Sequence, residues 1–144
     1  MKKILGLLLI IPLIVFAQKQ PHGVTYDAKV LRVNDGDTIV IAAPFLPAPL
    51  KPELAVRIYG VDTPEKGHRA KCSKEDKQAQ LASKYTSQLI AKGEKIQVTI
   101  YAWDKFGGRV LGSIIIDGVD LRTELIRNGF AREYYGEEKK SWCR

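Results

Sequence analysis

The stretch Arg57-Ile-Tyr-Gly-Val-Asp-Thr-Pro-Glu65 places a cation, two carboxylates and a helix-breaking proline where a predicted strand gives way to a loop. The strand is predicted over 54–61, and strict alternation puts Arg57 on the face opposite the aliphatic Val56 and Ile58. Taken alone, the stretch suits an ordinary surface strand followed by an acidic turn. Whether the stretch forms a functional site therefore depends on which residues from the rest of the chain lie near it.

Two further predicted turns carry the same kinds of side chain. Upstream, Asp35-Gly-Asp-Thr38 is typical of a tight hairpin, because the glycine after an aspartate tolerates a positive φ. Downstream, Asp104-Lys-Phe-Gly-Gly-Arg109 joins the last two predicted strands. Carboxylates and arginines thus recur at the points where predicted strands end.

The spacing of apolar residues predicts five strands and two helices. The predicted elements are strands over 26–33, 38–43 and 54–61, a helix over 75–91, strands over 95–103 and 109–116, and a helix over 120–128. This order is that of a closed Greek-key barrel of the OB type. We expect an α+β fold, a five-stranded OB-fold β-barrel with two to three helices. Such barrels favour nucleic acid as a ligand without establishing it.

Two connections are expected to be irregular. Residues 44–52 contain four prolines and predict an extended surface loop. Residues 66–74 are basic and predict a mobile segment between the third strand and the first helix.

The first residues predict a secretory signal peptide over 1–17. Lys2 and Lys3 precede an apolar run over 4–16, and Ala17 offers a small residue before the cut. The run is shorter than the roughly 20 residues that span a bilayer, although a retained anchor is the alternative. Residues 18–25 are expected to form a flexible lead-in, followed by one domain over 26–144. We expect an exported protein, periplasmic or extracellular, with no stable membrane association after cleavage.

The chain has two cysteines, Cys72 and Cys143, and their spacing does not match a metal site. In an exported protein such a pair favours a disulfide. The bond would tie the C-terminal tail to the segment that follows Glu65, and it would stabilise the fold by up to about 4 kcal/mol. Two free thiols are the alternative.

The formal net charge is +7, with 23 Lys and Arg against 16 Asp and Glu, and loss of Lys2 and Lys3 lowers it to +5. A basic chain favours polyanionic partners such as nucleic acid or an anionic envelope surface. A modest positive charge is also common in soluble proteins, so the charge alone decides nothing.

The carboxylates Asp37, Asp62 and Glu65 lie at the ends of two different predicted strands, and a barrel can bring these ends together. Oxygen ligands suit Ca²⁺, Mg²⁺ or Mn²⁺ rather than Zn²⁺, and His22 and His68 are isolated. Arginines near such a site would match a phosphate, because the guanidinium is planar and always protonated. Together these are the parts of a phosphodiester hydrolase.

The three motifs, in this order and with a helix between the second and third, closely resemble the staphylococcal nuclease (thermonuclease) family. The resemblance covers about 30–135. It implies an OB-fold barrel with helices and a Ca²⁺-dependent endonuclease that cleaves DNA and RNA and leaves 3′-phosphate ends.

The resemblance also implies roles for individual carboxylates. Asp37 and Asp62 match direct Ca²⁺ ligands, with the main-chain carbonyl of Thr63 as a third. Asp35 resembles a nearby carboxylate that supports the metal shell. Glu65 matches the residue that orients or deprotonates the attacking water, and the choice between these two roles stays open.

Arg57 and Arg109 match the two arginines that hold the phosphoryl oxygens. The turn before Arg109, with Gly107 and Gly108, is one residue longer than the family pattern. A structural ion pair with Asp104 is the alternative role for Arg109.

The nucleotide-binding residues depart further from the family. Phe106 stands in place of a tyrosine, which keeps a stacking surface but loses a hydroxyl. Of two adjacent tyrosines we match Tyr135 to the first tyrosine of a family pair, and Glu137 stands where the second would be.

Two other functions compete with an exported calcium-dependent nuclease. One is a non-catalytic OB-fold module that binds nucleic acid through its basic surface, and the other is an envelope protein whose fold is stabilised by calcium. Neither requires all of the carboxylates and arginines named above. The sequence indicates no obligate protein partner, and we expect a monomer.

Overall fold

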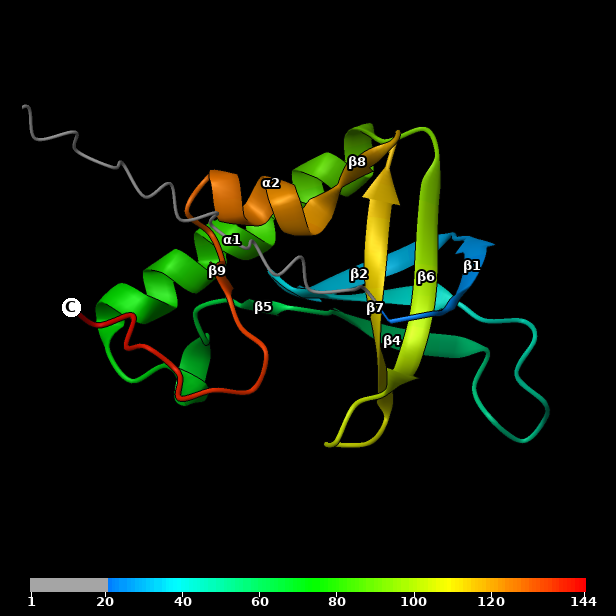
Figure 1. Ribbon diagram of the computed structural model, residues 1–144, viewed down its shortest axis with the longest axis horizontal. Helices are drawn as coiled ribbons and strands as arrows, with labels where there is room; N and C mark the ends of the chain where they lie inside the picture. Colours follow the sequence, from blue (N-terminus) through cyan, green and yellow to red (C-terminus); the bar gives the residue numbers. More distant parts are fainter. Residues whose placement is uncertain (1–20) are drawn as a thin grey trace, which may run out of the picture.

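The computed structural model describes residues 21–144, which form one folded unit of strands and helices (Figure 1). The predicted signal peptide over 1–17 and the first part of the lead-in lie outside the described residues. The elements are β1 (Val24–Asp27), β2 (Val30–Asp35), β3 (Thr38–Ala42), β4 (Glu53–Ile58), β5 (Val61–Asp62), the 3₁₀-helix η1 (Gly67–Arg69), α1 (Ser73–Lys92), β6 (Ile96–Trp103), β7 (Arg109–Ile116), β8 (Val119–Asp120), α2 (Leu121–Arg127) and β9 (Arg132–Glu133). Between residues 21 and 144, the helices are too short or too polar to cross a membrane.

The main sheet is mixed, with strand order β1-β6-β7-β4-β3-β2, and β8 pairs with β7. The β4–β7 pairing is parallel and the neighbouring pairings are antiparallel. In Figure 1, α1 lies beside β2 and α2 lies beside β7. The fold is OB-fold-like with two α-helices. A closed barrel of five strands is not confirmed, because among residues 21–144 the edge strands β1 and β2 do not pair with each other.

The strand predicted over 26–33 is divided between two neighbours. The Ala28 amide donates to the carbonyl of Ile96 in β6, whereas the Lys29 carbonyl accepts from the amide of Ala42 in β3. The chain therefore changes partner within one extended run. Val24 and Thr25, at the end of the predicted lead-in over 18–25, pair with β6.

The strand predicted over 54–61 is also shorter than expected. β4 ends at Ile58, and Gly60 turns the chain with a φ of 77°. The next residues form β5, which pairs with β9 near the C-terminus. The irregular connection predicted over 44–52 is found, and Phe45 in it stacks on Tyr26 with ring centroids 5.2 Å apart.

Alternation along β4 places the functional side chain as predicted. Val56 and Ile58 are fully buried in the core, while Arg57 lies on the other face and is only partly buried. The buried core contains residues of the strands and of α2, and partly buried side chains of α1, such as Tyr85 and Leu89, pack against it. It comprises Ile39, Ile41, Ala43, Leu54, Val56, Ile58, Val61, Val98, Val110, Ile114, Ile116, Leu121, Leu125 and Ala131.

Helix α1 fixes the Asp35-Gly-Asp turn. A Cβ added to Gly36 would lie 2.8 Å from the Cβ of Ala82, so only glycine allows this close approach. The buried Thr86 hydroxyl donates to the Gly36 carbonyl at 2.7 Å. The turn that carries Asp35 and Asp37 is thus held against a long helix.

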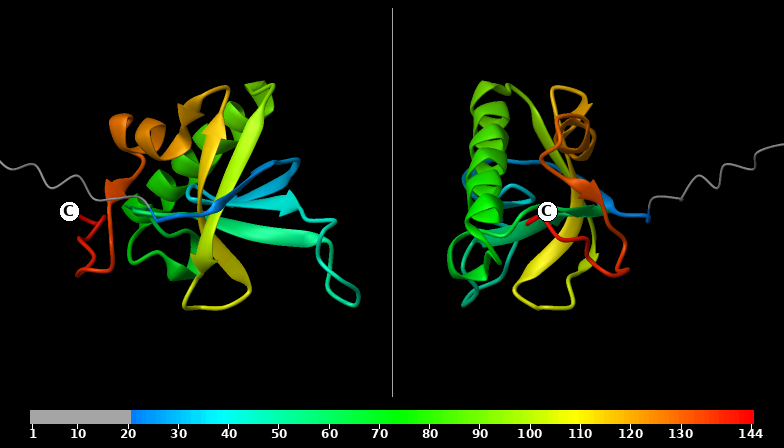
Figure 2. Two further views of the ribbon diagram at one scale, coloured as in Figure 1. Left: turned by 45° about the vertical axis from the view of Figure 1, so that its right-hand side comes forward. Right: turned by 90° about the vertical axis from the view of Figure 1, so that its left-hand side faces the viewer.

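The predicted disulfide joins Cys72 and Cys143, whose Cα atoms are 6.0 Å apart. Cys72 also caps α1, so the bond ties the tail to the first turn of the helix. Figures 1 and 2 show the C-terminal tail close to α1. The segment over 66–74, predicted to be mobile, is ordered instead. It contains η1, and the Lys71 amide donates to the buried Glu75 carboxylate at 2.7 Å.

Removing the disulfide should destabilise the protein without changing its fold. For the double variant Cys72→Ser/Cys143→Ser we expect the free energy of unfolding to fall by up to about 4 kcal/mol, because the unfolded chain regains the entropy of a long loop. Urea unfolding followed by circular dichroism measures the loss. Reductant should weaken the parent protein similarly and leave the variant unaffected. Equal stability of parent and variant would contradict the prediction.

Candidate active site

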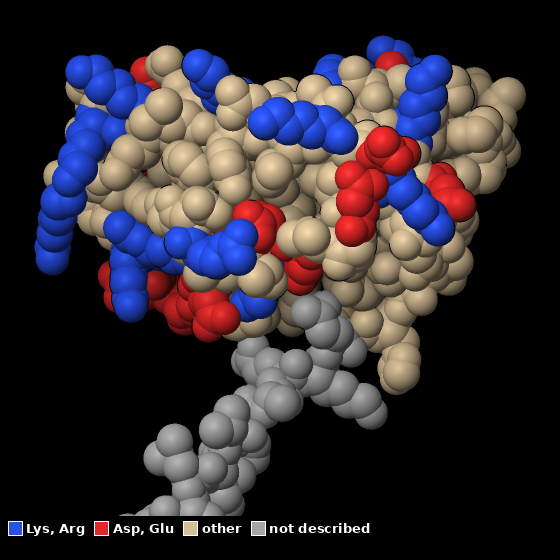
Figure 3. All heavy atoms as spheres, turned by 90° about the horizontal axis from the view of Figure 1, so that it is seen from above, with Lys and Arg blue, Asp and Glu red and all other residues tan. Residues whose placement is uncertain are grey.

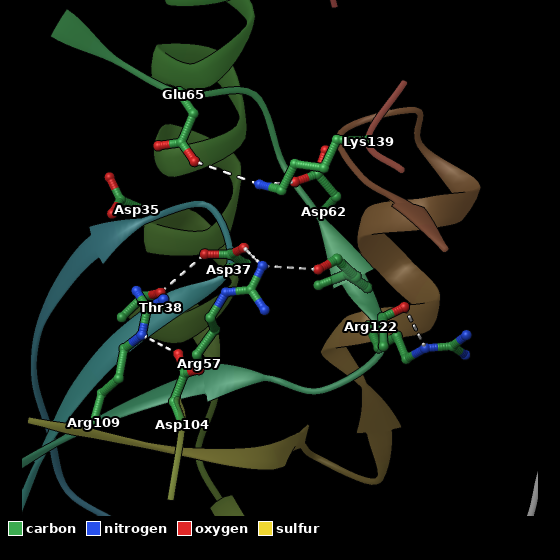
Figure 4. A network of polar contacts seen from close by, with 12 residues as sticks. Asp35, Asp37, Thr38, Arg57, Asp62, Glu65, Asp104, Arg109, Arg122 and Lys139 are labelled. Atoms are coloured by element: carbon green, nitrogen blue, oxygen red, sulfur yellow. Dashed lines mark hydrogen bonds and ion pairs between the residues drawn. The ribbon is translucent and has the colours of Figure 1, made fainter. Parts of the chain in front are cut away.

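A cavity of about 430 Å³ lies where the Asp35-Gly-Asp turn, β4, the β6–β7 turn and the tail meet. It gathers side chains that are far apart in the sequence, and Figure 4 shows the polar contacts among them. The residues that line it are Asp35, Asp37, Arg57, Thr63, Pro64, Glu65, Arg69, Asp104, Lys105, Phe106, Gly107, Arg109, Tyr134 and Lys139.

Asp37, in the turn just before β3, and Arg57 of β4 form a partly enclosed ion pair. One carboxylate oxygen of Asp37 accepts from the Thr38 hydroxyl at 2.9 Å, and the other lies 3.3 Å from Arg57 Nη2. Arg57 Nη2 also donates to the Val61 carbonyl at 3.1 Å. The guanidinium is therefore fixed at the cavity with donors left over, since five N–H groups are available.

Arg109 reaches the same cavity from the start of β7. Its Nε donates to the buried Asp104 carboxylate, so the ion pair considered as its alternative role is present. The longer turn does not carry it away from the cavity, because Gly107 and Gly108 both adopt positive φ values, of 68° and 67°. Phe106 projects from this turn and is 73% exposed.

Asp35 and Glu65 are linked through Arg69. Arg69 Nη2 lies 3.1 Å from Asp35 and its Nε lies 3.4 Å from Glu65. The hydrogen bond to Asp35 raises the pKa of Arg69. The Glu65 amide donates to the buried Glu75 carboxylate at 3.2 Å, which anchors the loop, while the Glu65 side chain stays 38% exposed. Its carboxylate is therefore positioned and still open to water.

Asp62 is buried beside the cavity, and both of its oxygens are engaged. Oδ1 lies 2.6 Å from the Lys139 ammonium, and Oδ2 accepts from the Trp142 indole at 3.0 Å. Burial acts to lower the pKa of Lys139, but the hydrogen bond and charge of Asp62, with the charge of Glu65, leave that pKa raised. Thr63, also buried, follows at the cavity wall.

Comparison with known proteins agrees with this geometry. A family model described as "Staphylococcal nuclease homologue" matches residues 55–142, more than half of the chain. The chain belongs to this family. The resemblance seen in the three motifs is thereby confirmed.

This staphylococcal nuclease homologue also matches a much longer protein. It is 34% identical over 116 residues to a Bacillus subtilis (strain 168) protein named "Endonuclease YhcR". The aligned region covers 76% of the present chain and 9% of that relative. The chain thus corresponds to a small part of the relative's length.

Within this family member, Tyr134 rather than Tyr135 faces the cavity. The Tyr134 amide donates to the Gly60 carbonyl at 3.1 Å, and the next residue turns away. Tyr135 accepts from Arg122 Nη2 at 2.8 Å and packs edge-on against Tyr59. Tyr135, predicted to bind nucleotide, thus lies outside the lining of the cavity, and its neighbour Tyr134 lines it instead.

The tail residues Lys139 and Trp142 were not predicted to belong to the site. The only sequence signal was the adjacent Cys143, since a bond to Cys72 brings the tail to the segment after Glu65. Lys139 lines the cavity and Trp142 contacts Asp62 directly.

The donor set fits a hard divalent cation. Asp37, Asp62 and Thr63 offer only oxygen atoms, and a cationic ammonium already lies against Asp62 and Glu65. Among residues 21–144, the only group of three or more His, Cys, Asp or Glu side chains at metal-ligand spacing comprises Cys72, Glu75 and Cys143. Its two sulfurs are bonded to each other and so are not thiolate ligands.

Proposed function

We propose that the protein is an exported, calcium-dependent nuclease that hydrolyses phosphodiester bonds of DNA and RNA and leaves 3′-phosphate ends. The observation that carries the proposal is that Asp37, Arg57, Glu65 and Arg109, from separate segments, line one cavity. Membership of the staphylococcal nuclease homologue family supports the same chemistry.

The two arginines would bind the phosphate. Each is held by a carboxylate, Arg57 by Asp37 and Arg109 by Asp104, so their positions are set before substrate arrives. Planar guanidinium groups donate two parallel hydrogen bonds to phosphate oxygens and retain their charge. Donors fixed in advance stabilise the negative charge that grows on those oxygens in the transition state.

Glu65 would act on the attacking water. Its carboxylate lines the cavity, and its loop is anchored by Glu75. A carboxylate in this position can orient a water molecule and accept its proton.

Asp37, Asp62 and the Thr63 carbonyl would hold Ca²⁺. Asp35 would support this metal shell as a nearby carboxylate. When bound, the ion supplies positive charge that polarises the phosphodiester.

Exposed aromatic side chains would bind the bases. Phe106 projects from the β6–β7 turn, and Lys105 Nζ lies 5.1 Å from its ring centroid. Stacking on an aromatic ring accepts every base, which suits cleavage of both DNA and RNA. On the face drawn in Figure 3, basic side chains are spread among neutral and acidic ones, so we place substrate binding at the cavity instead.

An activity assay tests the proposal. The full chain is incubated with single-stranded DNA or RNA in Ca²⁺, Mg²⁺, Mn²⁺ or chelator. We expect cleavage of both substrates in Ca²⁺, loss of cleavage in chelator, and product ends that a polymerase extends only after phosphatase treatment. Binding without cleavage under every ion would instead support the non-catalytic OB-fold module.

A further inference from the structure

The Lys139 ammonium lies between two carboxylates of the candidate metal site. Its Nζ is 2.6 Å from Asp62 Oδ1 and 3.7 Å from Glu65 Oε1. Figure 4 shows the side chain reaching from the tail across to both residues. A positive charge thus bridges the carboxylate assigned to the metal and the one assigned to water.

The tail around Lys139 is held on both sides. Trp142 is buried, donates to Asp62 Oδ2, and packs against the Arg132 guanidinium at 3.7 Å from the ring centroid. Arg132 Nη1 donates to the carbonyls of Lys140 and Ser141 at 3.2 and 3.0 Å. With the disulfide at Cys143, these contacts bring the backbone of Lys139 to the site.

The side chain itself can still leave. It is 44% exposed, whereas the Asp62 side chain is 6% exposed, so the ammonium can move into solvent while the carboxylate stays in place. A divalent ion at Asp62 Oδ1 would take the position of the ammonium. A divalent ion bound at Asp62 Oδ1 and the Lys139 ammonium would repel each other, and this repulsion is stronger beside a buried carboxylate than in water.

We propose that Lys139 is an internal counter-cation that occupies the cation position between Asp62 and Glu65 and must be displaced before a divalent ion binds. The inference rests on the proposed metal site. In the metal-free protein Lys139 compensates the buried Asp62 carboxylate, which would otherwise be costly to keep charged. The same contact weakens metal binding, so the tail sets the Ca²⁺ concentration at which the site fills.

Calorimetric titration with Ca²⁺ tests the inference without relying on activity. For Lys139→Met we expect the Kd for Ca²⁺ to fall roughly three- to tenfold. In the parent protein, Ca²⁺ binding must break the half-exposed ion pair between Lys139 and Asp62, whereas the variant has no such pair to break. Lys140→Met is the matched control, since it removes the same charge from the adjacent exposed residue, and its Kd should stay within about twofold of the parent value. An unchanged or weaker affinity in Lys139→Met would overturn the inference while leaving the metal site standing. Failure of all three proteins to bind Ca²⁺ would overturn the metal site and the inference with it.

Chemical labelling of the unmodified protein gives a second measurement. Reductive methylation followed by peptide mass spectrometry reports how accessible each lysine amine is. We expect the labelling rate of Lys139 to rise severalfold on addition of Ca²⁺, relative to Lys140 in the same sample. Equal labelling of Lys139 with Ca²⁺ and with chelator would show that the ammonium is not displaced and would overturn the inference.

Discussion

Glu65→Gln is expected to lower kcat by roughly 10²- to 10³-fold, the usual contribution of a positioned proton acceptor. The amide keeps the size of the side chain but has far lower affinity for a proton. Its contacts with Arg69 and Lys139, at 3.4 and 3.7 Å, involve a partly exposed group, so the stability of the fold should change little. The Glu75 contact to the Glu65 main chain is unaffected by this substitution.

Steady-state cleavage of a single-stranded oligonucleotide in saturating Ca²⁺ measures the loss. Glu53→Gln is the control, because Glu53 is a partly exposed carboxylate paired with Arg32 outside the cavity. If Glu65 accepts the proton, the acidic limb of the kcat profile against pH should disappear in Glu65→Gln; if it only orients water, that limb should persist. Near-parental activity in the variant would remove Glu65 from the mechanism.

Much of the fold follows from local sequence. The β-strands β3, β6 and β7 match their predicted ranges closely, because apolar alternation reports which face each strand buries. Helix α2 lies within the range predicted for it, and the Asp120 carboxylate accepts from the Arg122 amide at its N-terminus. The same alternation placed Arg57 opposite the core.

The unpredicted parts depend on distant partners. Extended residues around Ala28 have the same local preference whether they pair with β6 or β3, and only the tertiary hydrogen bonds make the division. β5 and β9 are two residues each, too short to show a period. The predicted closed five-stranded barrel required strand pairings that local pattern does not specify.

Both predicted arginines and most of the predicted carboxylates line the cavity, whereas the tail residues beside them were not predicted. The turn motifs carry their own geometry, whereas residues 134–142 have no regular period. Which of two adjacent tyrosines faces the cavity is set by the β5–β9 pairing, and the place of Lys139 is set by Trp142 and the disulfide. Sequence spacing alone could indicate only that the tail returns to this region.

Arg57→Ala is expected to lower kcat/KM by roughly 10²- to 10³-fold, the loss typical of removing a fixed donor to transition-state charge. It should also lower the free energy of unfolding by about 1 to 3 kcal/mol, because the buried Asp37 carboxylate loses its ion-pair partner. Arg32→Ala is the matched control, since Arg32 forms an exposed pair with Glu53 on the same sheet, and both its activity and its stability should stay near the parent values.

Arg57→Lys separates the two effects of Arg57. A lysine retains the positive charge beside Asp37, so we expect most of the lost stability to return, as measured by urea unfolding. It does not offer two parallel donors, so kcat should remain at least about tenfold below the parent value even at saturating substrate. If Arg57→Ala instead raises KM and leaves kcat unchanged, Arg57 binds substrate and transition state equally, and its assigned part in stabilising the developing charge is wrong. If Arg57→Lys restores activity together with stability, the arginine serves mainly to keep Asp37 in place.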